Sequence, residues 1–362
     1  MSTGDDRHIL GLEQIPDGED EAIRKVIALE LQILKRTIDP NDTRRVEPPV
    51  PRGQHPKHHG CVHAEFTIEK VIPQEFRFGV FGGLKTTFPA WIRFSNARVH
   101  DDRKKGGHGM AIKLMQVEGE KLLAGQEHEQ TQDFLLLDSP TFFIKNAIEF
   151  GEFDAARLQS TFSRRPSLVQ LVLIRRYLYK HPRELWRLFR IEHNRSSNPL
   201  ETSYWSGTPY KLGTGAVKYM VEPRSDGLPI VAAVKSQDQL RDAMKLNLQT
   251  RAADFDFYVQ PQSDPAKEPV EDATRRWRTS PLKVATIHVP RQSFDSPAQM
   301  EFCENLSFNP WHSLPDHRPL GSLNRLRKAT YVALSDFRHK ENHKPSIEPT
   351  PETMRSDTKP AA

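Results

Sequence analysis

The chain has 362 residues, enough for one large domain or two of ordinary size. Its 52 basic and 47 acidic residues leave a net charge of +5, a small excess that does not favour nucleic-acid binding. The N-terminus lacks the hydrophobic core of a secretory signal, and the longest apolar run, residues 167–174, is too short to span a bilayer. Two cysteines, Cys61 and Cys303, form no disulfide framework, so we expect a reducing, cytoplasmic location.

The two ends of the chain differ in composition from its middle. Residues 20–38 carry apolar side chains at helical spacing, so we expect a helix with one buried face. Residues 39–60 hold five prolines and several basic side chains, which is typical of an extended arm. We therefore expect an N-terminal helix and arm over residues 1–54. The proline-containing, charged residues 341–362 predict a disordered tail.

Between these ends, residues 55–340 form the predicted folded domain. From Cys61 the pattern has a period of two: Val62, Ala64 and Phe66 face one way, and His63 faces the other. Further strands are expected over residues 89–99, 108–117, 131–143, 215–223, 228–235, 255–261 and 283–290. Helices are expected over residues 148–160, 167–194, 238–253 and 321–339. Eight short strands with few helical crossovers predict an α+β fold built on an antiparallel eight-stranded β-barrel with surrounding helices.

The last predicted helix carries a stripe of three functional side chains. Arg327, Tyr331 and Arg338 are separated by four and seven residues, which places them on one helix face. A free phenol titrates near ~10, and a guanidinium one turn away favours the phenolate. An arginine-paired phenolate is the iron ligand in haem sites of the catalase type. By itself, however, the stripe also fits a surface helix with two solvated arginines and one packed tyrosine.

Several stretches in this order resemble the haem catalase family, and the pattern is closest to its smaller, peroxidase-like members. The resemblance covers residues 55–340. It rests on five short motifs, which are Val62-His63-Ala64, Arg93-Phe94-Ser95-Asn96, Gly109-Met110-Ala111-Ile112-Lys113, Asp138 to Phe143 with Phe150, and Arg327-x-x-x-Tyr331 with Arg338.

This resemblance implies a catalase-like barrel with a pocket for haem b. Tyr331 would be the iron ligand, supported by Arg327. His63 would be the distal acid–base residue, with a tautomer fixed by Ser95. The remaining haem contacts implied are propionate pairing by Arg93 and Arg338 and apolar contacts by Val62, Phe142, Phe143 and Phe150.

Two departures from the catalase pattern concern the distal side. The asparagine that helps to position peroxide in catalases is absent, and the aligned stretch begins Leu136-Leu137-Asp138. The arginine expected three residues before the distal histidine is replaced by Gly60. Arg44, Arg45 and Arg52 on the preceding arm are candidate substitutes. Without the asparagine, we expect turnover of a second hydrogen peroxide to be weakened.

The pattern therefore predicts a haem peroxidase or catalase-type oxidoreductase. Its expected partners are hydrogen peroxide or an organic hydroperoxide and an organic electron donor. A lipid hydroperoxide isomerase or lyase and a non-catalytic haem-binding protein remain alternatives. Full-length catalases are tetramers, but the arms that knit them together are not evident here, so homo-oligomerisation stays open. The cluster of His55, His58, His59, Cys61 and His63 also suggests zinc, but no second ligand cluster accompanies it.

Overall fold

The fold is a β-barrel with helices packed outside it. The computed structural model describes residues 10–40, 45, 47, 49–162, 172, 175, 176, 179–224 and 235–350, with side chains omitted for residues 157–162. Eight strands form the barrel in the part of the chain so described. They are β1 (Lys57–Ile68), β2 (Thr87–Asn96), β3 (His108–Met115), β4 (Thr131–Leu137), β5 (Tyr204–Trp205), β7 (Gly215–Pro223), β8 (Ala253–Pro261) and β9 (Leu282–Val289).

The barrel is closed by its shortest strand. Neighbouring strands pair antiparallel in the order β5-β4-β3-β2-β1-β9-β8-β7, and β5 also pairs with β7 through Tyr204 and Val221. A further short strand, β6 (Tyr210–Leu212), pairs with β7. The prediction of an eight-stranded antiparallel barrel in an α+β fold is thus confirmed. The predicted strand at 228–235 falls almost wholly outside the described residues, and β5 was not predicted because two residues show no periodicity.

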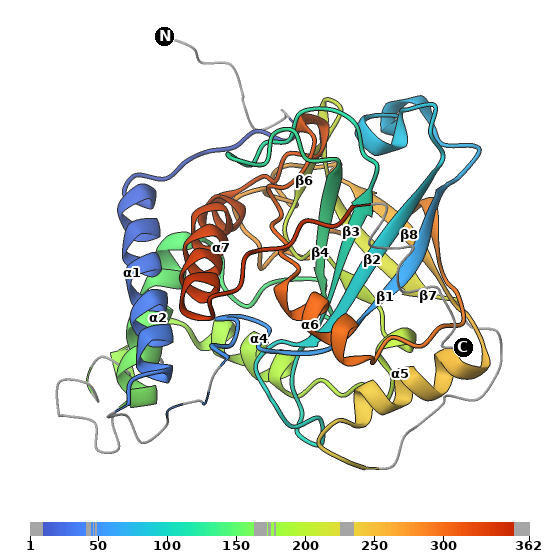
Figure 1. Ribbon diagram of the computed structural model, residues 1–362. Helices are drawn as coiled ribbons and strands as arrows, with labels where there is room; N and C mark the ends of the chain where they lie inside the picture. The colour runs from blue at the N-terminus through green and yellow to red at the C-terminus, as the bar shows by residue number, and fades with distance from the viewer. Residues whose placement is uncertain are drawn as a thin grey trace, which may run out of the picture.

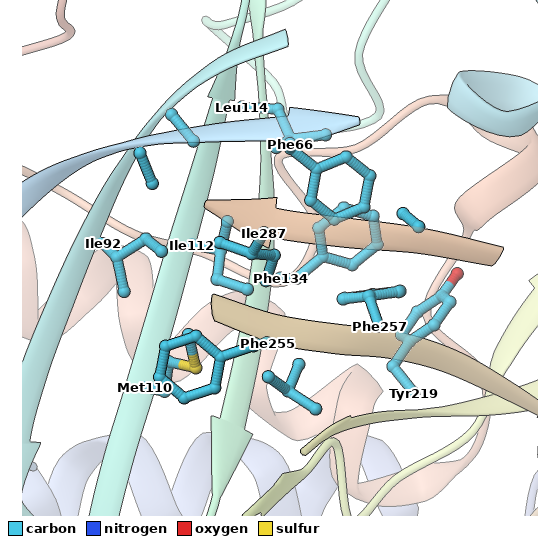
Figure 2. Packing of buried hydrophobic residues seen from close by; sticks show 14 of the residues in the cluster. Phe66, Ile92, Met110, Ile112, Leu114, Phe134, Tyr219, Phe255, Phe257 and Ile287 are labelled. Atoms are coloured by element: carbon cyan, nitrogen blue, oxygen red, sulfur yellow. The ribbon is translucent and has the colours of Figure 1, made fainter. Parts of the chain in front are cut away.

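The barrel interior is packed with large apolar side chains (Figure 2). On β1, Val62, Ala64 and Phe66 point inward and are buried, as the period of two predicts. The ring of Phe257 lies 5.1 Å from that of Phe66, and that of Phe134 lies 5.2 Å from Phe257. Burying one phenylalanine side chain stabilises the fold by about 1.5–3 kcal/mol. This packed core therefore holds the strands firmly, so that the outer face of the barrel is a rigid surface.

Six helices are present in the described residues, and three of them pack together beside the barrel (Figure 1). They are α1 (Glu19–Thr37), α2 (Ala147–Phe162) and α7 (Ser322–Glu341), joined by an apolar cluster that includes Val26 and Leu326. The other three are α4 (Pro182–Glu192), α5 (Gln239–Thr250) and α6 (Pro297–Asn305). Short 3₁₀ turns occur at Gln74–Phe76, Gly79–Phe81, Pro199–Glu201 and Pro315–His317.

The helices expected at 20–38, 148–160, 238–253 and 321–339 are confirmed as α1, α2, α5 and α7. Of the helical insertion expected at 167–194, the structure describes α4, while most of residues 163–178 lie outside the described part. Among the described residues, no helix combines the length and apolar character needed to cross a membrane.

Two predictions about the periphery are corrected. Cys61 on β1 and Cys303 on α6 are buried and form a disulfide with a Cα–Cα distance of 5.4 Å. They lie 242 residues apart and meet because α6 packs on β1, which their spacing cannot reveal. The inference from cysteine usage to a reducing, cytoplasmic location therefore loses its basis. The start of the tail is also ordered, since Ile347 bridges to Leu306 and Glu348 pairs with Lys113.

Candidate functional site

A cavity lies between α7 and the outer face of the barrel. Its barrel wall is built from β2, β3 and β4, and its opposite wall from α7, with additional residues from α1 and from the arm before β1. The strand register fixes which wall residues face it. Ser95, Gly109 and Leu137 are neighbours in one row across the three strands, and Arg93 and Ala111 belong to the next row.

The histidine in this cavity is His55, which the sequence analysis did not select. Its Nδ1 lies 2.9 Å from Ser95 Oγ. Gly109 makes room for the imidazole, since a Cβ there would overlap the His55 ring. Burial, reinforced by the charges of Arg93 and Arg52, lowers the pKa of His55 to about 3. The imidazole is therefore neutral at pH 7.

The backbone at His55 is unusual for a side chain of this size. Its φ angle is 53°, in the left-handed region that residues other than glycine seldom adopt. His55 precedes Pro56, which further narrows its conformations. Arg52 clamps the turn by donating from Nε to the His55 carbonyl and from Nη2 to the Pro56 carbonyl. Such strain is found mostly where a functional side chain must be held in place.

The structure contradicts the placement of His63 and Val62 in the pocket. His63 packs against Trp91, with ring centroids 3.9 Å apart, and it does not line the cavity. Trp91 precedes Ser95 by four residues on β2, which is about 13 Å along a strand. Ser95 therefore cannot orient His63. Val62 points into the barrel interior, where it is fully buried.

A signal in the sequence could have identified His55. The expected spacing places an arginine three residues before the distal histidine, and that position is Gly60 for His63. The same spacing is intact eight residues earlier, where Arg52 precedes His55. An arginine at this spacing, absent before His63, is therefore present before His55.

One end of the cavity gathers three arginines around a carboxylate. Arg52, Arg93 and Arg338 all line it. Arg93 Nη1 donates to the Leu306 carbonyl at 2.8 Å. Arg338 donates to the Glu304 side chain at 3.0 Å and to its carbonyl at 2.9 Å. Arg52 Nη1 lies 2.6 Å from Glu304 Oε2. The end of α6 thus holds all three guanidinium groups.

Burial lowers the pKa of Arg93, but a guanidinium stays protonated at pH 7, so three arginines and one ionised glutamate give this end a net charge of +2. Although burial raises the pKa of Glu304, Arg52 and His58 outweigh it and hold that pKa well below its usual range. Burial lowers the pKa of His58 to about 4, so His58 is neutral at pH 7. Burial and the charge of Arg52 lower the pKa of Arg338 to about 10, which still leaves it protonated. A ligand with two carboxylates would neutralise the remaining charge.

On the helix side, Tyr331 and Arg327 both line the cavity. Arg327 Nη2 lies 3.5 Å from the Tyr331 oxygen, at the long limit of a hydrogen bond, and the guanidinium lies 5.4 Å from the ring centre. Asn324 fixes Arg327 by accepting from Nη1 at 3.1 Å. The stripe of Arg327, Tyr331 and Arg338 is therefore assembled in one cavity, rather than exposed on a surface helix.

The rest of the lining is mostly apolar. Phe142, Phe143 and Phe150 line the cavity as expected, together with Leu137 and Leu188. Asp138 and Asn96, the polar residues beside Leu137 and Ser95, do not line the cavity, and their side chains bond to other residues. The Asp138 side chain lies 2.7 Å from His108 Nδ1, and that of Asn96 lies 3.0 Å from His59 Nε2.

Comparisons with known proteins identify the fold. No protein-family model matches the chain, and no curated protein matches it. Among solved structures, 108 chains match, and catalases are among them. A bacterial catalase aligns with a TM-score of 0.58 at 16% identity, covering 84% of this chain and 61% of the catalase. Catalase A from Saccharomyces cerevisiae aligns with a TM-score of 0.59 at 17% identity, covering 86% of this chain and 69% of the catalase. A fungal catalase aligns with a TM-score of 0.57 at 16% identity, covering 86% of this chain and 66% of the catalase.

The chain therefore has a catalase-like fold and spans roughly two thirds of the length of these neighbours. In the described residues, no group of three or more histidine, cysteine or acidic side chains could hold a metal ion. Of the zinc candidates, Cys61 is in the disulfide, and His55, His58 and His59 bond to three different partners.

Proposed function

We propose that the chain is a haem-dependent, peroxide-consuming oxidoreductase. One observation carries this proposal: a neutral, serine-oriented imidazole and an arginine-paired phenol line one cavity whose end presents three arginines. Haem needs this set, namely an anionic oxygen for ferric iron, cations for two propionates and an apolar slot for the ring. A bound haem b would supply two-electron exchange with a peroxide.

Tyr331 would hold the iron through its phenolic oxygen. The guanidinium of Arg327, one helical turn away, would place its positive charge beside this oxygen. Arg52, Arg93 and Arg338 would bind the propionates. With Glu304 ionised, three guanidinium charges face three carboxylates, so the buried assembly would be neutral.

His55 would act on the peroxide in place of His63. In the tautomer in which Nδ1–H donates to Ser95 Oγ, Nε2 is unprotonated. It can accept a proton from the inner peroxide oxygen and return that proton to the departing oxygen. Ser95 thus retains its predicted role, but toward a different histidine.

The lining favours an organic hydroperoxide and an organic donor over two molecules of hydrogen peroxide. Leu137 offers no hydrogen bond to a second peroxide, and the phenylalanines disfavour a small polar substrate. The second candidate, a lipid hydroperoxide isomerase or lyase, is supported by the same apolar lining. A storage site, by contrast, would need no distal base such as His55.

Two assays on the haem-loaded wild type distinguish these functions. We expect a phenolic donor to be oxidised faster than oxygen is released from hydrogen peroxide. Oxygen release as the dominant reaction would favour a catalase. Consumption of a fatty-acid hydroperoxide without any donor would favour the isomerase. No reaction with any of these peroxides would refute the proposed function.

A further inference from the structure

We propose that the outer face of α4 docks the protein onto anionic lipid bilayers. In this helix, PRELWRLFRIE, Trp186 and Phe189 are three residues apart and therefore share a face. Their side chains are 59% and 57% exposed. Together with Tyr179 just before the helix, they are the exposed large aromatic residues of the described chain. Concentration of such residues in one short segment marks an interaction surface.

The same segment is strongly basic. Arg190 lies over the Trp186 ring at 5.0 Å, in a cation–π arrangement. Between residues 179 and 195, five basic side chains face two acidic ones, and one acidic residue, Glu184, pairs with Arg187 at 3.2 Å. The basic residues are Lys180, Arg183, Arg187, Arg190 and Arg195. The aromatic rings are thus surrounded by an excess of positive charge.

This combination matches a membrane surface better than a protein partner. A helix that lies in the bilayer interface has tryptophan or phenylalanine on one side and arginine beside them. Its rings enter the boundary of the acyl layer, and its guanidinium groups meet lipid phosphates. Both aromatic residues are exposed on one side of α4, which lies below α7 in Figure 1.

The inner side of α4 connects this surface to the cavity. Leu188 lies between the two aromatic residues in sequence and lines the cavity. Docking through Trp186 and Phe189 would therefore bring the apolar side of the cavity close to the bilayer. If the proposed function holds, hydroperoxides dissolved in the membrane would reach the site by this route. Membrane docking itself does not depend on haem or on turnover.

The test uses the full-length protein and vesicles of two compositions. We expect co-sedimentation with vesicles containing about 30 mol % phosphatidylserine and little with pure phosphatidylcholine. Raising the salt from about 0.05 to 0.5 M should weaken binding, because exposed charges are screened. Trp186 fluorescence should shift to the blue on binding. The other four tryptophans, at positions 91, 205, 277 and 311, are already buried or half-buried.

Matched variants locate the contact. Trp186→Ala with Phe189→Ala should weaken vesicle binding by about 100-fold, since each of the two rings contributes about one factor of ten when fully buried. Arg190→Gln should weaken it by about fivefold. Leu84→Ala and Arg103→Gln change exposed residues elsewhere and should leave binding unchanged.

Three outcomes would overturn the proposal. The first is the absence of binding to anionic vesicles. The second is binding that the α4 variants and the control variants reduce equally. The third is a wild-type dimer that becomes monomeric in the Trp186→Ala, Phe189→Ala variant without any vesicle binding, which would assign this face to a second copy of the chain.

Discussion

Replacing His55 with alanine should slow the reaction of the haem-loaded protein with peroxide, whereas replacing His63 with alanine should not. A positioned acid–base side chain contributes about 10²- to 10⁴-fold, so we expect at least a 10²-fold loss for His55→Ala. His63 packs on Trp91 away from the cavity and provides the matched control. Both variants should still bind haem, because neither side chain is a proposed ligand.

The pKa of His55 also predicts how the rate of reaction with peroxide depends on pH. With a pKa of about 3, the imidazole is about 1% protonated at pH 5 and less at higher pH. The base is then fully available, and the wild-type rate should be flat from pH 8 to pH 5. An ordinary histidine, with a pKa near 6.5, would lose about 97% of its neutral form at pH 5.

The assay is a stopped-flow measurement of the change in the haem spectrum after mixing with peroxide, across that pH range. Equal losses for His55→Ala and His63→Ala, or an unaffected His55→Ala variant, would refute the assignment. A wild-type rate that falls tenfold or more between pH 7 and pH 5 would show that the site histidine is not held neutral.

Leu137→Asn should raise oxygen release from hydrogen peroxide by about tenfold or more, because it supplies a hydrogen-bond donor on the distal side; unchanged release would remove the account of the missing asparagine. Gly109→Ala should cost about 1–3 kcal/mol in urea unfolding because its Cβ meets the His55 ring, whereas Gly215→Ala, which has room, should cost far less. Acidification should destabilise the fold, because burial lowers the pKa of His317 to about 3; the unfolded chain then binds more protons between pH 6.5 and pH 3. His317 alone predicts a loss of about 2 kcal/mol from pH 7 to pH 5, and unfolding curves that coincide at these two pH values would contradict this.

Sequence reasoning succeeded where a pattern repeats along the chain. The period of two on β1 correctly separated Val62 and Phe66 from His63, and helical spacing correctly united Arg327 with Tyr331. Both features are set by residues a few positions apart in the sequence, so they can be predicted without knowing the tertiary structure.

The same reasoning failed where geometry is irregular or long-range. His55 lies in a strained turn before β1, where no periodicity operates, and its link to Ser95 spans 40 residues. The alternation on β1 correctly predicts that His63 lies on the outer face of the barrel. It does not predict which part of that face borders the cavity. The disulfide between Cys61 and Cys303 depends on packing of α6 against β1, which no local pattern encodes.

Haem binding through Tyr331 is the central claim, and a spectroscopic titration tests it most directly. Wild-type protein produced with a haem precursor should show a Soret band, and the metal-free protein should take up one haem per chain. Tyr331→Phe removes the phenolic oxygen but keeps the ring, so it should lose haem or bind it much more weakly, with a changed spectrum. A wild type without a Soret band, or a Tyr331→Phe variant with an unchanged spectrum and affinity, would contradict the account.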